Sequence, residues 1–191
     1  MINVLIVEDD PMARKLLEIY INDSEEYKLS QSIESAAMAE LYCRRNPIDL
    51  ILMDVCTAMD ANGLDAAAKI KKSCPHIKII IVTSQPEFSF IERARKAGVE
   101  SFWYKSASAE EIIEVMNRTM AGDSVYPDTT PSLRLGEALN VDFTEKELLV
   151  LREVVDGEAD ADIAEKLGMS LRTVKAHIQN MRDKTGFRNR T

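Results

Sequence analysis

Short apolar runs alternate with amphipathic stretches along the first 122 residues. The apolar runs predict strands at residues 2–7, 29–33, 50–53, 79–82 and 102–104. The stretches between them space apolar residues three to four apart, which predicts helices at residues 12–22, 36–45, 64–72, 88–97 and 109–120. Several strands are nearly continuous Val, Ile and Leu, as in parallel strands covered on both faces. We therefore expect an α/β fold with a flavodoxin-like, doubly wound, five-stranded parallel sheet.

The rhythm changes after residue 122. Residues 123–142 contain two prolines and several Ser, Thr and Asp residues without an apolar period, which predicts a linker. From residue 143 the pattern is helical only, and three helices are expected at residues 145–155, 160–167 and 171–184. Thr144 and Glu147 predict a capping box, and Ser170 predicts an N-cap. We expect an α/β domain at 1–122, a linker at 123–142 and an all-α domain at 143–191.

Composition narrows the class of protein. The chain is 46% hydrophobic and 29% charged, as in ordinary soluble globular proteins. No apolar run approaches the roughly 20 residues of a membrane helix, and the N-terminus lacks the basic region of a signal peptide. The three cysteines have no metal-like spacing, which fits a reducing compartment. We therefore expect a cytoplasmic protein without a membrane partner.

Charge is unevenly distributed along the chain. The net charge is −8, but residues 166–191 hold seven Lys and Arg against the single acid Asp183, a local charge of +6. A basic end on an acidic body favours a nucleic-acid partner for that end.

Reactive side chains are predicted at the carboxyl ends of the strands. Glu8 and Asp9 follow the first strand, Asp54 ends the third, and Thr83 and Lys105 end the fourth and fifth. Parallel strands end at one sheet edge, where ligands bind, so these groups should gather there. Crowded carboxylates need a cation, and an all-oxygen ligand set favours Mg²⁺. Beside such an ion Asp54 could attack phosphorus, with Lys105 balancing charge and Thr83 donating a hydrogen bond.

Residues 162–181 have the pattern of a helix-turn-helix. A short helix is followed by a turn at Gly168 and by a longer helix after Ser170. Apolar residues at core spacing leave the other faces to Arg172, Thr173, Lys175, Ala176, Gln179 and Arg182. A helical hairpin with a solvated basic face is the alternative, but the turn and the local charge favour DNA binding.

Four segments resemble the receiver domain of two-component response regulators. They are Ile6 to Pro11, Leu52 to Asp54, Val82 to Ser84 and Phe102 to Lys105. The resemblance covers residues 1 to about 121. It implies that Asp54 accepts the phosphoryl group, that Glu8 and Asp9 form the acidic pair, and that Asp9, Asp54 and the backbone carbonyl of Cys56 hold Mg²⁺. Asp10 occupies the position after the pair, which varies in the family, and is a weaker candidate than Glu8 for a role in the acidic pair.

The same resemblance implies that Thr83 and Phe102 are the switch hydroxyl and the switch aromatic. The sequence departs from the family in two places. Thr57-Ala58 replaces the usual Met-Pro, and Gly63 comes one residue later than usual, so the loop after the acceptor is not predicted. Ser106 stands where a proline with a cis bond is common, and a cis bond is therefore not expected there.

The helical segment resembles the LuxR-type DNA-binding domain of the NarL/FixJ class in Phe143-Thr144, Ile163-Ala164 and Thr173-Val174-Lys175. The resemblance makes residues 171–184 the recognition helix. It implies base contacts by Lys175, Ala176 and Gln179, and contacts nearer the DNA backbone by Arg172, Thr173 and His177. His177 could equally be a packed histidine of the helix surface. The class has a fourth helix beyond the point where this sequence stops. We therefore expect either that the sequence is a shortened form or that this form binds DNA weakly.

Together these patterns predict a phosphorylation-activated transcriptional response regulator rather than a metabolic enzyme. Its expected partners are a sensor histidine kinase, promoter DNA and, when phosphorylated, a second copy of the chain. The alternative is an atypical regulator controlled by a protein or ligand instead of phosphate. A phosphohydrolase is disfavoured because it needs an acid where Cys56 stands. A ligand-sensing LuxR protein is disfavoured because the first half has the regular βα pattern.

Overall fold

The chain folds into two compact units, Met1–Thr129 and Thr130–Thr191. The computed structural model describes residues 1–85, 87–105, 109–127, 134–139 and 142–188. Ser106, and with it the peptide bond expected to be trans, lies outside the described residues. None of the helices in the described ranges is long and apolar enough to cross a membrane.

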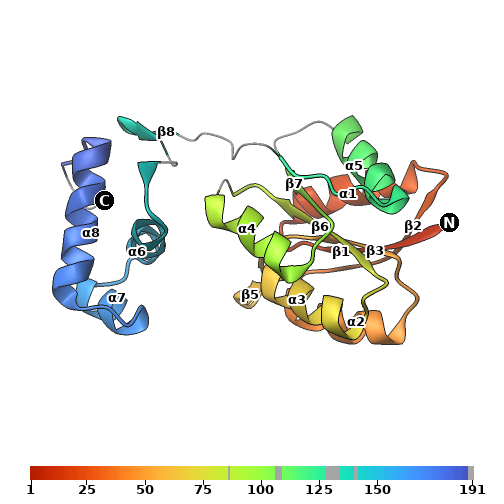
Figure 1. The fold of residues 1–191 in the computed structure, drawn as a ribbon, viewed down its shortest axis with the longest axis horizontal. Coiled ribbons are helices and arrows are strands. Elements are labelled where there is room, and N and C mark those ends of the chain that lie inside the picture. The colour runs from red at the N-terminus through yellow and green to blue at the C-terminus, as the bar shows by residue number, and fades with distance from the viewer. Residues whose placement is uncertain (86, 106–108, 128–133, 140–141, 189–191) are drawn as a thin grey trace. The chain divides into compact units, whose positions relative to one another are not determined.

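A five-stranded parallel sheet forms the centre of the first unit (Figure 1). Its strands, given in spatial order, are β2 (Tyr27–Ile33), β1 (Ile2–Val7), β3 (Leu50–Met53), β6 (Lys78–Thr83) and β7 (Ser101–Tyr104). This order, with β1 and β3 at the centre, confirms the flavodoxin-like sheet expected from the sequence. The point where the strand order reverses lies between β1 and β3, so the carboxyl ends of these strands are the expected ligand edge.

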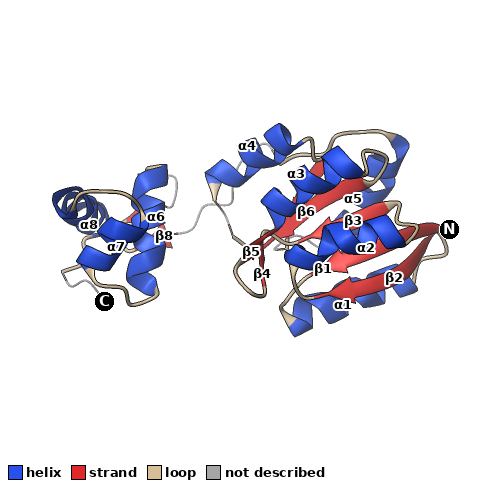
Figure 2. Ribbon diagram, turned by 90° about the horizontal axis from the view of Figure 1, so that it is seen from below, coloured by secondary structure: helices blue, strands red, loops and turns tan. Residues whose placement is uncertain are grey.

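Helices cover both faces of this sheet (Figure 2). Helices α1 (Pro11–Asn22) and α5 (Ala109–Ala121) pack on one face. The other face is covered by the 3₁₀ helix η1 (Ala36–Met38), α2 (Ala39–Arg45), α3 (Gly63–Ser73) and α4 (Phe88–Ala97). In β3, Leu50 and Leu52 join the first core and Ile51 and Met53 the second. The central strands are thus buried on both faces, which explains their continuous apolar sequence.

Residues after α5 pack onto strand β7. The backbone carbonyl of Val125 accepts a hydrogen bond from the Phe102 N–H at 2.8 Å. The Tyr126 hydroxyl donates to the Val99 carbonyl at 2.8 Å, and the Arg95 guanidinium lies 4.0 Å from the centre of the Tyr126 ring. The ring of Tyr126 packs against that of Phe102, with centroids 6.3 Å apart. The beginning of the expected linker therefore belongs to the packed body of the first unit.

The second unit is built around three helices, α6 (Glu145–Val155), α7 (Asp160–Lys166) and α8 (Leu171–Thr185). Their shared core includes Val150, Ile163, Val174 and Met181. The predicted caps are both present. The capping box joins Thr144 and Glu147, and the hydroxyl of Ser170 accepts a hydrogen bond from the Thr173 N–H at 3.1 Å. Local sequence thus sets the starts of α6 and α8.

A small hairpin lies within the residues expected to form the linker. Strands β8 (Arg134–Leu135) and β9 (Ala138–Leu139) pair antiparallel across a two-residue turn. Gly136 has φ 65°, and a Cβ there would lie 2.2 Å from the Thr185 carbonyl oxygen, so glycine is required. Ala138 is buried in the core of the second unit. Two-residue strands are too short to show an alternating pattern, which is why the sequence did not predict this hairpin.

Candidate functional site

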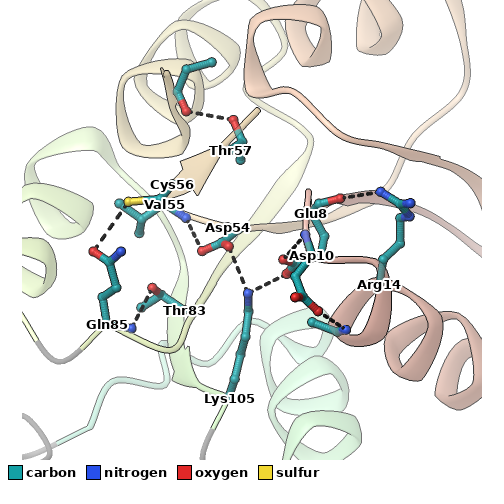
Figure 3. A network of polar contacts seen from close by, with 12 residues as sticks. Glu8, Asp10, Arg14, Asp54, Val55, Cys56, Thr57, Thr83, Gln85 and Lys105 are labelled. Carbon is teal, nitrogen blue, oxygen red and sulfur yellow. Dashed lines mark hydrogen bonds and ion pairs between the residues drawn. The ribbon is translucent and has the colours of Figure 1, made fainter. Parts of the chain in front are cut away.

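The five predicted side chains gather at the carboxyl edge of the sheet. Figure 3 shows Glu8, Asp54, Thr83 and Lys105 there, and Asp9 belongs to the same acidic cluster. The ammonium of Lys105 lies 2.6 Å from Oε2 of Glu8 and 2.9 Å from Oδ2 of Asp54. Glu8, Asp54 and Thr83 are buried, with exposed fractions of 1%, 7% and 1%, whereas Asp9 is exposed at the rim. Strands β1, β3, β6 and β7 each bring one or two of these groups to the same place. The ammonium of Lys105 is therefore held between the buried carboxylates of Glu8 and Asp54, with the hydroxyl of Thr83 beside them.

The donor set fits a hard divalent cation. One oxygen from each of Glu8, Asp9 and Asp54 can be chosen so that all three lie within 4.8 Å of one another. The cluster holds three carboxyl groups, and the Lys105 ammonium contacts two of them, Glu8 and Asp54, so negative charge exceeds positive charge among these four side chains. Oxygen ligands of this kind suit Mg²⁺, which keeps several waters and takes only one or two carboxylates directly.

Electrostatics at the site are governed by burial. Burial raises the pKa of Glu8 to about 7; contact with Lys105 opposes the shift and the charge of Asp54 adds to it. Burial alone would lower the pKa of Lys105, but its hydrogen bonds and charge interactions with Asp54 and Glu8 outweigh burial, and the pKa is raised. Lys105 is therefore charged at neutral pH, while Glu8 still holds a proton in part of the molecules.

This shift predicts a pH dependence of stability. The folded-state pKa of Glu8 lies above its unfolded value, so the native state binds more protons, and stability falls as pH rises from about 4.5 to about 7. At about 1.4 kcal/mol per pKa unit, the shift from 4.5 to about 7 corresponds to a loss on the order of 3–4 kcal/mol. Glu8→Gln should remove most of this loss of stability. The measurement is urea unfolding in EDTA at pH 5 and at pH 8. Glu40→Gln, on the surface of α2, is the control; equal slopes for all three proteins would contradict the assignment.

Backbone contacts fix Asp54 and its neighbours. Oδ1 of Asp54 accepts a hydrogen bond from the Val55 N–H at 2.6 Å, which leaves Oδ2 to Lys105. The hydroxyl of Thr83 accepts from the Gln85 N–H at 3.1 Å. A Cβ at residue 63 would lie 1.8 Å from the Asp54 carbonyl oxygen, so glycine is required there by the close approach of the chain to Asp54.

The remaining predicted residues take different places. Cys56 lies in the two-residue strand β4 (Cys56–Thr57), with its thiol exposed and 3.4 Å from Oε1 of Gln85. Phe102 is 1% exposed, and its ring meets that of Tyr104 edge-on at 5.1 Å. Asp10 caps α1: its carboxylate accepts from the Ala13 N–H at 2.7 Å. The cap explains why an acid stands at this variable position.

Sequence reasoning missed Arg14. Its guanidinium donates to the backbone carbonyl of Glu8 at 3.0 Å and forms an ion pair with Glu34 at 3.2 Å. It thereby holds the turn that carries the acidic pair. The available signal was the spacing, since residue 14 lies one helical turn after the N-cap Asp10 and faces back toward the turn.

The second unit presents the polar face expected of its last helix. On α8 the exposed members of the predicted set are Arg172, Thr173, Lys175, Ala176 and Gln179, while His177 is half-buried. Val174 and Met181 point into the core. Lys184 is occupied within the unit: its ammonium binds the Glu147 carboxylate at 2.7 Å and the Asp142 carbonyl at 2.9 Å. Most of the predicted DNA-contacting side chains are thus available on one helix.

Comparisons with known proteins cover both units. The response regulator receiver domain matches residues 4–117, and the luxR family of bacterial regulatory proteins matches residues 141–191. The response regulator protein VraR of Staphylococcus aureus is 30% identical over 195 aligned residues, spanning 100% of this chain and 93% of VraR. VraR of Staphylococcus epidermidis matches equally.

Solved structures show the same fold. The RcsB response regulator of Salmonella typhimurium matches with a TM-score of 0.62 at 20% identity, over 98% of this chain and 93% of that one. A LuxR-family two-component response regulator from Aurantimonas sp. SI85-9A1 has a TM-score of 0.61 at 22% identity, over 68% and 89%. The chain therefore belongs to the response regulators that join a receiver domain to a LuxR-type DNA-binding domain.

Proposed function

We propose that this response regulator is switched by transfer of a phosphoryl group to Asp54. The observation that carries the proposal is the buried carboxylate of Asp54, held 2.9 Å from the Lys105 ammonium within an acidic cluster. In the transfer, a carboxylate oxygen of Asp54 forms the bond to phosphorus. The bond from phosphorus to the donor breaks, and the donor keeps the electron pair; for a sensor histidine kinase that donor is a phosphohistidine nitrogen.

The surrounding residues have separate roles in this proposal. Asp9, Asp54 and the backbone carbonyl of Cys56 hold Mg²⁺, and the buried carboxylate of Glu8 adds negative charge beside it. When bound, Mg²⁺ supplies positive charge for the phosphoryl oxygens. Lys105 supplies a second positive charge.

A switch links the acceptor to the rest of the receiver. The Thr83 hydroxyl donates a hydrogen bond to a phosphoryl oxygen, and Phe102 rearranges with it. Thr83 ends β6 and is the partner of Tyr104 in the register of β6 with β7. Tyr104 lies two residues after Phe102 on β7. A shift of Thr83 is therefore passed directly to the strand that carries the aromatic side chain.

The output is control of transcription through promoter DNA. Helix α8 enters the major groove, where Lys175, Ala176 and Gln179 face the bases and Arg172 and Thr173 lie nearer the phosphates. His177 belongs to the second group. Phosphorylation favours a homodimer bound to a promoter. The protein therefore acts in the cytoplasm, where the chromosomal DNA lies. It acts on no metabolic substrate and has no membrane partner.

The full chain with acetyl phosphate tests the proposed function. Mass spectrometry should place one phosphoryl group on Asp54 in Mg²⁺ and none in EDTA. Beryllium fluoride, which mimics the phosphoryl group, should change the fluorescence of Trp103, the single tryptophan of the chain, only when Mg²⁺ is present. Absence of both responses would overturn the proposal and favour an atypical regulator controlled by a protein or ligand.

Substitutions on α8 should separate two kinds of DNA contact. Lys175→Ala is expected to cost about 1–3 kcal/mol of specific binding, because it removes a base contact. Arg172→Ala should weaken all DNA sequences alike and reduce the slope of log K against log salt by about 1. Lys146→Ala, an exposed change on α6, is the matched control. Fluorescence anisotropy with promoter and random duplexes at two salt concentrations makes the measurement, and equal losses for all three variants would contradict it.

A further inference from the structure

The segment after the acceptor forms a hairpin that the family pattern did not predict. Strand β4 pairs antiparallel with β5 (Ala61–Asn62), and Thr57 is the partner of Ala61. Residues 58–60 close the turn, with Met59 at φ 63° and Asp60 at φ 52°. Two successive non-glycine residues in the left-handed region are costly, so the surrounding contacts must hold this turn in place.

Thr57 supplies contacts that hold the hairpin. It is 6% exposed, and its hydroxyl oxygen accepts a hydrogen bond from the Ala36 N–H at 2.9 Å. The same hydroxyl donates to the Ala61 carbonyl at 2.7 Å (Figure 3). One side chain therefore links the two strands of the hairpin to the start of η1. The Ala58 N–H adds a backbone bond to the Glu34 carbonyl at 3.0 Å.

The hairpin is also fixed on the side of the acceptor. The Gly63 N–H donates to the Val55 carbonyl at 2.8 Å, and the missing Cβ at residue 63 lets the chain pass against the backbone of Asp54. Cys56 lies between this contact and the contacts of Thr57. The backbone of Cys56 is thus held on both sides. The Gly63–Val55 hydrogen bond holds it on one side, and the side chain of Thr57 holds it on the other.

We propose that Thr57 is a positioning residue for the metal site. Its hydroxyl holds the Cys56 backbone so that the Cys56 carbonyl can bind Mg²⁺. In this way Thr57 replaces the Met-Pro segment that is usual in the family and that this chain lacks. The inference rests on the proposed Mg²⁺-dependent function. Groups that orient metal ligands typically alter metal affinity 10- to 100-fold when they are removed.

The test measures Mg²⁺ affinity in the full chain without a phosphoryl donor. Thr57→Val keeps the shape and removes the hydroxyl, and should raise the Kd for Mg²⁺, followed by Trp103 fluorescence, about tenfold. Thr57→Ser keeps the hydroxyl and should stay within about twofold of wild type. Labelling by acetyl phosphate should slow in Thr57→Val at low Mg²⁺ and recover at saturating Mg²⁺. Hydrogen exchange of amides 56–62 in EDTA should be faster in Thr57→Val.

Two further variants separate positioning from stability. Thr119→Val removes another buried hydroxyl, one that donates to the Val115 carbonyl at 2.6 Å far along the chain from the acceptor, and should leave the Kd for Mg²⁺ unchanged. Ala36→Pro removes the N–H that Thr57 accepts from. Residue 36 is the first of η1 and follows extended Ser35, so its backbone angles suit proline. The ring takes the place of the hydrogen-bonded N–H, and its Cδ also pushes the Thr57 hydroxyl away. Ala36→Pro should weaken Mg²⁺ binding in the same direction even if Thr57→Val fails to fold.

The outcomes discriminate. A wild-type Kd in folded Thr57→Val, or in Ala36→Pro when Thr57→Val does not fold, would overturn the inference. A loss in Thr57→Ser as large as that in Thr57→Val would also overturn it, because the hydroxyl would not be the active group. If wild type binds no Mg²⁺, the proposed function itself is wrong, and that result is recognised before any variant is compared.

Discussion

Asp54→Asn is expected to lower phosphoryl transfer from acetyl phosphate by roughly 10³-fold or more, to below detection. The amide of asparagine is a far weaker nucleophile than the carboxylate, yet it has nearly the same size and can still accept the 2.6 Å hydrogen bond from the Val55 N–H. The fold should therefore survive. Mass spectrometry after incubation with Mg²⁺ and acetyl phosphate gives the measurement, and DNA affinity before and after incubation gives the functional result.

DNA binding should separate into two parts in this variant. The unstimulated affinity of Asp54→Asn should match that of unphosphorylated wild type, and only the increase caused by acetyl phosphate should disappear. Asp65→Asn, an exposed change on α3, should be labelled and stimulated like wild type. Labelling of Asp54→Asn at the wild-type rate would show that another side chain accepts the phosphoryl group.

Lys105→Met should destabilise the metal-free receiver by about 3–5 kcal/mol. The Lys105 side chain is 14% exposed and its ammonium contacts two buried carboxylates, so its removal leaves Glu8 and Asp54 without their counter-charge. The loss should be larger at pH 8 than at pH 5, because protonation relieves the repulsion at lower pH. Mg²⁺ should restore part of the stability and should bind more tightly than to wild type, since a competing positive charge is gone.

Lys71→Met provides a matched control for this experiment. The side chain of Lys71 is 15% exposed and its ammonium lies 2.6 Å from Glu100, so the same change breaks an ion pair outside the site. The lysine of this pair is as buried as Lys105, and its carboxylate, 25% exposed, is less buried than Glu8 or Asp54. Urea unfolding with and without Mg²⁺ should show two destabilised proteins, of which only Lys105→Met responds strongly to the metal. An equal response of both variants would mean that Mg²⁺ stabilises the chain by a route other than the acidic cluster.

Much of the receiver could be predicted because two levels of pattern agree. Continuous Val, Ile and Leu in β3 and β6 require burial on both faces, and this requirement determines the layered fold. Once the strands are parallel, the residues that follow them must share an edge. The gathering of Glu8, Asp54 and Lys105 followed from topology alone, without knowledge of any single contact.

The features that sequence did not predict depend on individual contacts. The two hydrogen bonds of Thr57 join residues 21 positions and four positions away, and neither has a periodic pattern. Arg14 could be placed on α1, but its contact with Glu34 needs the position of β2. The hairpin at residues 134–139 has strands of only two residues, and its position depends on the packing of Ala138 into the core of the second unit. Periodicity describes elements, whereas these features are pairings between elements.

The packing of Val125 and Tyr126 has a practical consequence for isolating the receiver. A fragment that ended at Ala121, the last residue of α5, would lose the ring that covers Phe102 and the acceptor for its N–H. The Phe102 side chain would then meet water on one side, and the switch that we propose for it would be measured in surroundings that differ from those of the longer chain. Spectroscopic work on an excised receiver should therefore use a polypeptide that runs through Tyr126.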